Sequence, residues 1–131
     1  MRRASAIGAV VAFLAALLGA GVASASDVGA LACGSSTHVS AKLERFNCGN
    51  FIGGVRVTVN RSIGLVGHWE FRDSNGHIRN EPQSGDVWLA GSRDTTVEKF
   101  VAIGTTFCAN LWESTGGGGY ALRGAPCFKI R

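Results

Sequence analysis

Two of the three histidines in this 131-residue chain fall in one short stretch with an acidic neighbour. His68 and Glu70 lie two positions apart, and residues 73–76 (DSNG) are typical of a tight hairpin turn. The return strand would then bring His77 close to Glu70. Such a cluster could bind a metal ion or act as an acid and base, whereas the alternative is a solvent-facing strip of paired charges. We favour the strip, because no H-E-x-x-H or H-x-H spacing supports a metal site.

The usual motifs of nucleophilic catalysis and phosphate binding are missing from the sequence. No serine lies in G-x-S-x-G or S-x-x-K, and the glycine run 116–119 is not followed by Lys and Ser or Thr. The nine Asp and Glu residues still permit many carboxylate pairs, so a small hydrolase stays open as an alternative. We predict no catalytic residue, no metal and no cofactor.

Three aromatic residues are the candidate binding residues. Trp88 and Trp112 alternate with apolar neighbours, so they should point away from the core if those neighbours point inward. Together with Tyr120 they could form a flat apolar surface suited to a sugar ring or a protein partner. The alternative is that loops cover these rings. Trp69 shares its strand face with apolar residues and is expected in the core.

Four cysteines are an even number, which in an exported chain indicates two disulfides. Three pairings are possible. We favour Cys33–Cys48 and Cys108–Cys127, because each closes a local loop and would contribute about 3 kcal/mol of stability. Zinc binding by these cysteines is disfavoured, because the sequence has no C-x2-C pair.

Residues 1–25 have the pattern of a secretory signal peptide. A basic start (MRR) precedes the uncharged, apolar residues 6–23, and residues 23–25 form an A-x-A cleavage site. A membrane anchor and a lipid attached at Cys33 are the alternatives. Cleavage would leave residues 26–131 as a single secreted domain.

The charge of the expected secreted domain points away from nucleic acid. It would keep 11 basic and 9 acidic side chains, so its net charge would be +2, whereas the whole chain carries +4. The basic residues are scattered along the sequence without a cluster. We therefore expect no nucleic-acid partner, and no membrane partner after cleavage.

Short alternations of apolar and polar residues, broken by glycine-containing turns, predict an all-β antiparallel domain. About seven or eight strands are typical of a small β-sandwich or barrel. A short helix is the alternative for residues 95–103, although their β-branched side chains favour a strand. The glycine run 116–119 is expected to be a flexible hairpin loop. The clearest alternations cover residues 38–46, 55–60, 65–72 and 105–112.

Size, two expected disulfides and the spacing of Cys33 and Cys48 make the chain similar to protease inhibitors of the subtilisin-inhibitor type. The second cysteine pair lies too late in the chain for that family, and no reactive-site loop lies between the two pairs, so we assign no family.

We expect a small secreted, non-catalytic binding module that contacts an extracellular glycan or protein through its aromatic residues. A secreted protease inhibitor or toxin-like protein is the first alternative, and a small secreted hydrolase is the second.

Overall fold

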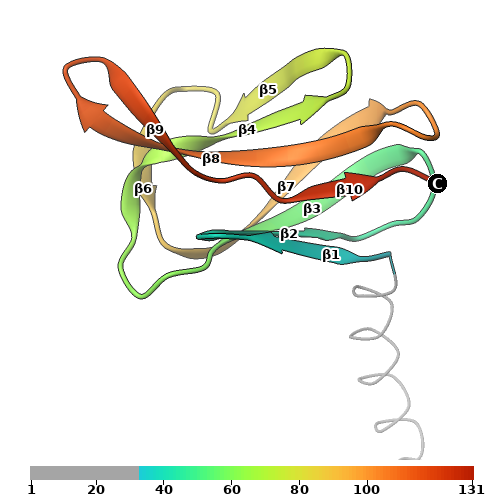
Figure 1. Ribbon diagram of the computed structural model, residues 1–131, viewed down its shortest axis with the longest axis horizontal. Coiled ribbons are helices and arrows are strands. Elements are labelled where there is room, and N and C mark those ends of the chain that lie inside the picture. Colours follow the sequence, from blue (N-terminus) through green and yellow to red (C-terminus); the bar gives the residue numbers. More distant parts are fainter. Residues whose placement is uncertain (1–32) are drawn as a thin grey trace, which may run out of the picture.

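A computed structural model describes residues 33–131, so the predicted signal peptide 1–25 lies outside the described residues. The described chain forms ten strands and is all-β (Figure 1). The strands are β1 (Ser35–His38), β2 (Ala41–Arg45), β3 (Phe51–Val59), β4 (Leu65–Asp73), β5 (Gly76–Glu81), β6 (Val87–Leu89), β7 (Gly91–Phe100), β8 (Thr106–Gly116), β9 (Gly119–Gly124) and β10 (Cys127–Lys129).

The strands form two antiparallel sheets, and Figure 1 shows β4, β5, β8 and β9 of one sheet above β1 and β2 of the other. One sheet has four strands in the order β1-β2-β3-β7. The other has six, in the order β10-β8-β4-β5, with β6 beside β4 and β9 beside β8. The central strands β4 and β8 pair continuously from Gly67–Glu113 to Asp73–Phe107. The prediction of an antiparallel all-β domain is therefore confirmed.

The described residues form ten strands, more than the seven or eight expected, and two boundaries differ from the sequence expectation. The strand expected at residues 38–46 begins only at Ala41, because the chain turns at Val39 after the last residue of β1, His38. Residues 95–103 lie mostly in β7, so the helical alternative is wrong. The glycine run forms a two-residue turn at Gly117 and Gly118, shorter than the four-residue loop expected. Within residues 33–131, no helix has the length and apolar character that a membrane crossing requires.

The core lies between the two sheets and takes apolar side chains from both. The three valines of β3, Val55, Val57 and Val59, all point inward, as their alternation predicts. In β4 the buried residues include Trp69, which is only 1% exposed, so its predicted core position is confirmed. Because every second side chain of a strand points into the core, the remaining side chains form the outer face of each sheet.

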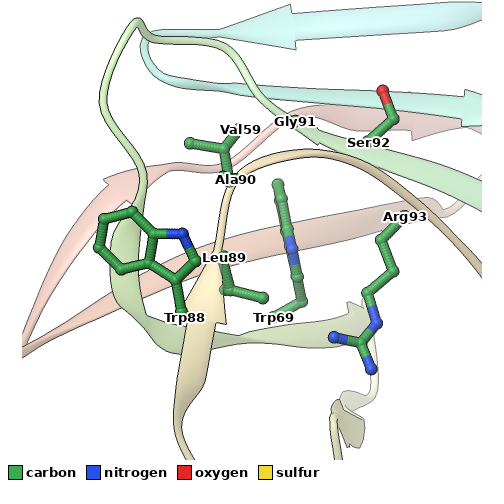
Figure 2. A pocket seen from close by; sticks show the side chains of 8 residues that line it. All are labelled: Val59, Trp69, Trp88, Leu89, Ala90, Gly91, Ser92 and Arg93. Carbon is green, nitrogen blue, oxygen red and sulfur yellow. The ribbon is translucent and has the colours of Figure 1, made fainter.

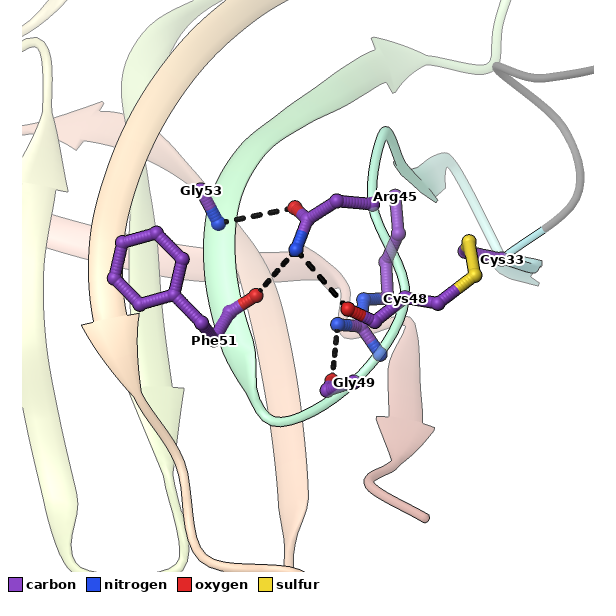
Figure 3. The surroundings of a disulfide bond; sticks show 7 residues. Cys33, Arg45, Cys48, Gly49, Phe51 and Gly53 are labelled. Atoms are coloured by element: carbon purple, nitrogen blue, oxygen red, sulfur yellow. Dashed lines mark hydrogen bonds between the residues drawn. A yellow bond between two sulfur atoms is a disulfide. The ribbon is translucent and has the colours of Figure 1, made fainter.

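Both predicted disulfides are present. Cys33–Cys48 ties the segment before β1 to the turn after β2, and Cys108–Cys127 joins directly paired residues of β8 and β10. Beside the first disulfide, the guanidinium of Arg45 donates a hydrogen bond to the carbonyl oxygen of Gly49 at 2.6 Å (Figure 3). Two disulfides are compatible with an extracellular or otherwise oxidising compartment.

Candidate functional site

An open cleft of about 500 Å³ lies on the outer face of the six-stranded sheet. It forms there because the inner residues of β4 fill the core, which turns the alternate residues of β4 outward. Trp112 of β8 is paired with His68 of β4, so the two side chains share this face. The lining residues are His68, Glu70 and Arg72 of β4, His77 and Asn80 of β5, Trp112 of β8 and Tyr120 of β9.

The Glu70 carboxylate is the centre of one half of the cleft. Its Oε1 accepts hydrogen bonds from Trp112 Nε1 at 3.0 Å and Asn110 Nδ2 at 3.4 Å. Its Oε2 accepts from His77 Nδ1 at 2.8 Å and Arg72 at 3.1 Å. Burial alone would raise the pKa of Glu70, but the bonds from His77 and Trp112 and the charge of Arg72 hold it below its ordinary value. Glu70 is therefore a firmly ionised acceptor with its hydrogen-bonding capacity in use.

Asp86, which precedes β6, organises the other half. Its Oδ1 lies 2.9 Å from His68 Nδ1, and its Oδ2 accepts a hydrogen bond from the Tyr120 hydroxyl at 2.9 Å. The hydrogen bond from His68 lowers the pKa of Asp86 despite the opposing effect of burial, and Tyr120 adds to the lowering. The hydrogen bond between Tyr120 and Asp86 also raises the pKa of Tyr120. The rings of His68 and Tyr120 meet edge to face at 5.0 Å, so both rings are held in place.

Each histidine of the cleft binds a carboxylate through Nδ1. Since an ionised carboxylate can only accept, Nδ1 of His68 and of His77 must be the donor, and Nε2 of the neutral ring is left as an acceptor. No side-chain hydrogen bond within residues 33–131 uses the amide of Asn80, which also lines the cleft. The cleft therefore offers polar groups with spare hydrogen-bonding capacity beside two fixed aromatic rings.

The cleft joins two features that the sequence presents separately. The contact between His77 and Glu70 follows from the predicted turn, since Asp73 pairs with Gly76 in the observed hairpin. Trp112, a predicted aromatic contact, lies half-buried against this same polar cluster. No group of three or more His, Cys, Asp and Glu side chains within residues 33–131 is arranged to hold a metal ion.

Trp88, the third predicted aromatic residue, lies outside the cleft. It points outward and is 62% exposed, but its pairing with Val66 places it nearer the start of β4. The ring covers Gly64, where an added Cβ would meet it at 2.7 Å. It lines a second pocket together with Trp69 (Figure 2). Trp88 therefore does not line the pocket that Trp112 and Tyr120 share.

Asp86 was missed by the sequence analysis, and no local pattern identifies it. Its position depends on β6 pairing with β4 across the whole β4–β5 hairpin, which places Val87 opposite Gly67 and Asp86 beside His68. Asn80 was also missed, because a bulge shifts the hairpin register between Phe71 and Arg72. A regular register counted from the DSNG turn would place Arg79 opposite Glu70 instead of Asn80.

Comparisons with protein families, with curated proteins and with solved structures find no match to this chain. The function is therefore argued from the chemistry of the cleft. Two fixed aromatic rings and several polar groups with spare capacity are the features that a ligand would meet there.

Proposed function

We propose that this protein is a non-catalytic binding module that holds a glycan in the outer-face cleft. The observation that carries the proposal is the placement of Trp112 and Tyr120 in one cleft, each with its polar atom bonded to a carboxylate. Rings that are fixed before binding lose little conformational freedom when a ligand packs on them. The apolar ring faces suit the C–H face of a sugar, and the surrounding polar groups suit its hydroxyls.

The free polar groups favour a glycan over a protein partner. Asn80, His68 and His77 present donors and acceptors at the edges of the cleft, which match hydroxyl groups. A volume of about 500 Å³ lies in the range of small-ligand sites. An extracellular protein, including a protease bound as an inhibitor target, is the weaker alternative.

The pKa directions favour binding over glycoside hydrolysis. A glycosidase needs one carboxyl group that stays protonated near neutral pH to act as the general acid. Glu70 and Asp86 both have a lowered pKa, so both are ionised there and neither can donate that proton. A hydrolase of this type is therefore the weaker alternative at this site.

The test is an NMR titration of the ¹⁵N-labelled protein with neutral glucan, mannan and galactan oligosaccharides. At least one of these should shift the Trp112 indole N–H signal, and Tyr120→Ala should weaken that binding about tenfold. Phe100→Ala is the control, because Phe100 is an exposed ring outside the cleft, at the end of β7. The proposal fails if no oligosaccharide moves the Trp112 signal, or if both variants bind equally well.

We also propose that the chain is secreted after removal of residues 1–25. The A-x-A pattern at residues 23–25 and the two disulfides support export. Expression of the whole chain in a secreting host should release a product that begins at Ser26, as measured by intact mass. A cell-retained product with the mass of the whole chain would contradict this.

We further propose that the scaffold is a β-sandwich rather than a closed barrel. In the described part of the chain, the two sheets share no strand. The core contains side chains from both sheets, as the two inner faces of a sandwich require. An experimental structure in which a ladder of hydrogen bonds closes the two sheets into one would contradict the sandwich.

A further inference from the structure

A second pocket of about 210 Å³ lies where β6 leads into β7, and none of its lining residues lines the cleft. Figure 2 shows the ring of Trp88 on one side, the ring of Trp69 in the middle and the side chain of Arg93 on the other side. The remaining lining residues are Val59 and residues 89–92. This pocket is therefore separate from the cleft.

The buried Trp69 presents an unpaired hydrogen-bond donor to this pocket. The side chain is 1% exposed, yet no hydrogen bond within residues 33–131 uses its indole N–H. The fully occluded side-chain N and O atoms without a partner in the same residues belong to Arg45 and Arg79. Trp69 Nε1 is thus not fully occluded, and Trp69 lines this pocket. A buried N–H without a partner is unfavourable, so a ligand that brings an acceptor gains this bond.

The other walls of the pocket combine apolar side chains with polar side chains that already have partners, and the hydroxyl of Ser92 lies 2.9 Å from that of Thr58. Leu89 and Val59 are buried apolar residues, and Trp88 offers a large, mostly exposed ring. The guanidinium of Arg93 lies 3.1 Å from a carboxylate oxygen of Glu81, so its charge is compensated. The pocket consequently fits a small neutral group that combines one acceptor with an apolar end.

An acetamido group has this chemistry. Its carbonyl oxygen accepts one hydrogen bond, and its methyl group prefers apolar contacts. The exposed part of the Trp88 ring extends this pocket with a flat surface on which a sugar ring can pack. We propose that this pocket binds the acetamido group of an N-acetylated sugar, with Trp69 Nε1 donating to the carbonyl oxygen and Trp88 supporting the sugar ring.

The three tryptophans give three indole N–H signals, which makes the test direct. N-acetylglucosamine should shift the signals of Trp69 and Trp88 in the ¹⁵N-labelled protein. Glucose and glucosamine, which lack the acetyl group, should leave the Trp69 signal in place. An unmoved Trp69 signal, or equal shifts with glucose, would overturn the proposal. A shift confined to Trp112 would also overturn it, while leaving the proposed glycan binding in the cleft intact.

Two variants test the Trp69 N–H donor and the Trp88 ring separately. Trp69→Phe keeps a core ring but removes the N–H, and should weaken N-acetylglucosamine binding about tenfold. Because Trp69 lies in the core, Trp88→Ala provides a second variant at an exposed position, with a similar expected loss. Phe100→Ala should bind like the parent protein. Full affinity in Trp88→Ala would contradict the role of the exposed ring.

Discussion

The outer faces of the two sheets use polar residues in different ways. On the four-stranded sheet, directly paired residues of β3 and β7 satisfy each other. Arg56 and Asp94 form a two-pronged ion pair with a shortest distance of 2.7 Å, and the hydroxyls of Thr58 and Ser92 lie 2.9 Å apart. Here each polar group has one cross-strand partner and lies exposed. Such a face keeps the sheet soluble and offers little to a ligand.

On the six-stranded sheet the polar groups converge instead of pairing singly. Glu70 accepts hydrogen bonds from four side chains, and Asp86 binds both His68 and Tyr120. Irregularities in the register accompany this convergence, at residues 71–72 of β4 and at residues 111–112 of β8. Bulges of this kind redirect side chains. The four-stranded sheet also has an irregularity, at residues 52–54 of β3, so a bulge alone does not produce a site. The difference lies in the added strands, because β9 and the segment before β6 bring Tyr120 and Asp86 to the outer face of β4.

The largest effect is expected at Gly67, where β4 leaves no room for a side chain against the backbone of β8. A Cβ built at this position would lie 1.8 Å from the carbonyl oxygen of Trp112, so Gly67→Ala must push the two strands apart. We expect a loss of at least about 3 kcal/mol in the free energy of unfolding, measured with denaturant. Gly53→Ala on β3 is the control, since its nearest contact is a side-chain oxygen of Asn47 at 3.3 Å. Equal losses in the two variants would show that the close approach is unimportant.

The second prediction compares one carboxylate from each outer face. Glu70→Gln removes the negative charge to which four side chains donate. It also replaces one acceptor oxygen with an N–H₂ donor, so some of these side chains lose their acceptor. This should cost about 2 kcal/mol of unfolding free energy. Asp94→Asn breaks an exposed ion pair and should change stability far less, since solvent replaces the interaction. Chemical denaturation measures the unfolding free energy of both variants. A larger loss of stability in Asp94→Asn than in Glu70→Gln would contradict the distinction between the two faces.

The third prediction concerns acid. The folded-state pKa values of Glu70 and Asp86 lie below their ordinary values, so the unfolded chain binds more protons as the pH falls. Their contribution to stability is therefore complete above the ordinary carboxyl range and is lost as the pH falls below about 4. Unfolding free energies at pH 6, 5, 4 and 3 should show this loss, and Glu70→Gln should make it less steep. An unchanged slope in that variant would contradict the assignment to Glu70.

The sequence predicted the features that depend on local pairing. The valines of β3 face the core because a strand has a two-residue period, and His77 reaches Glu70 because a tight turn joins their strands. The two disulfides followed from the preference for local loops. Asp86 could not be placed in this way, because its contact with His68 requires β6 to return to β4 beyond an intervening hairpin. Non-local strand order is set by the packing of the whole sheet.

The aromatic residues show the same limit. Alternation correctly indicated that Trp88 points outward, but it could not tell which strand would lie next to it. The register with β4 places Trp88 beside Val66, whereas Trp112 lies beside His68. Residues that share a face can thus belong to different sites when their strands pair at different levels.

The smallest expected change in stability comes from the difference in backbone strain between one hairpin turn of each sheet. Gly117 takes its left-handed conformation in the β8–β9 turn without a steric penalty, whereas Val39 in the β1–β2 turn has a φ of 52°. A β-branched residue is strained there, and asparagine adopts this region more readily, so Val39→Asn should raise the unfolding free energy by about 1 kcal/mol. Val66→Asn, at an exposed strand position on β4, should instead lower it by about 0.5 kcal/mol, since asparagine is a poor strand former. Urea denaturation of both variants should therefore give opposite signs, and a loss of stability in Val39→Asn would show that the β1–β2 turn is unstrained.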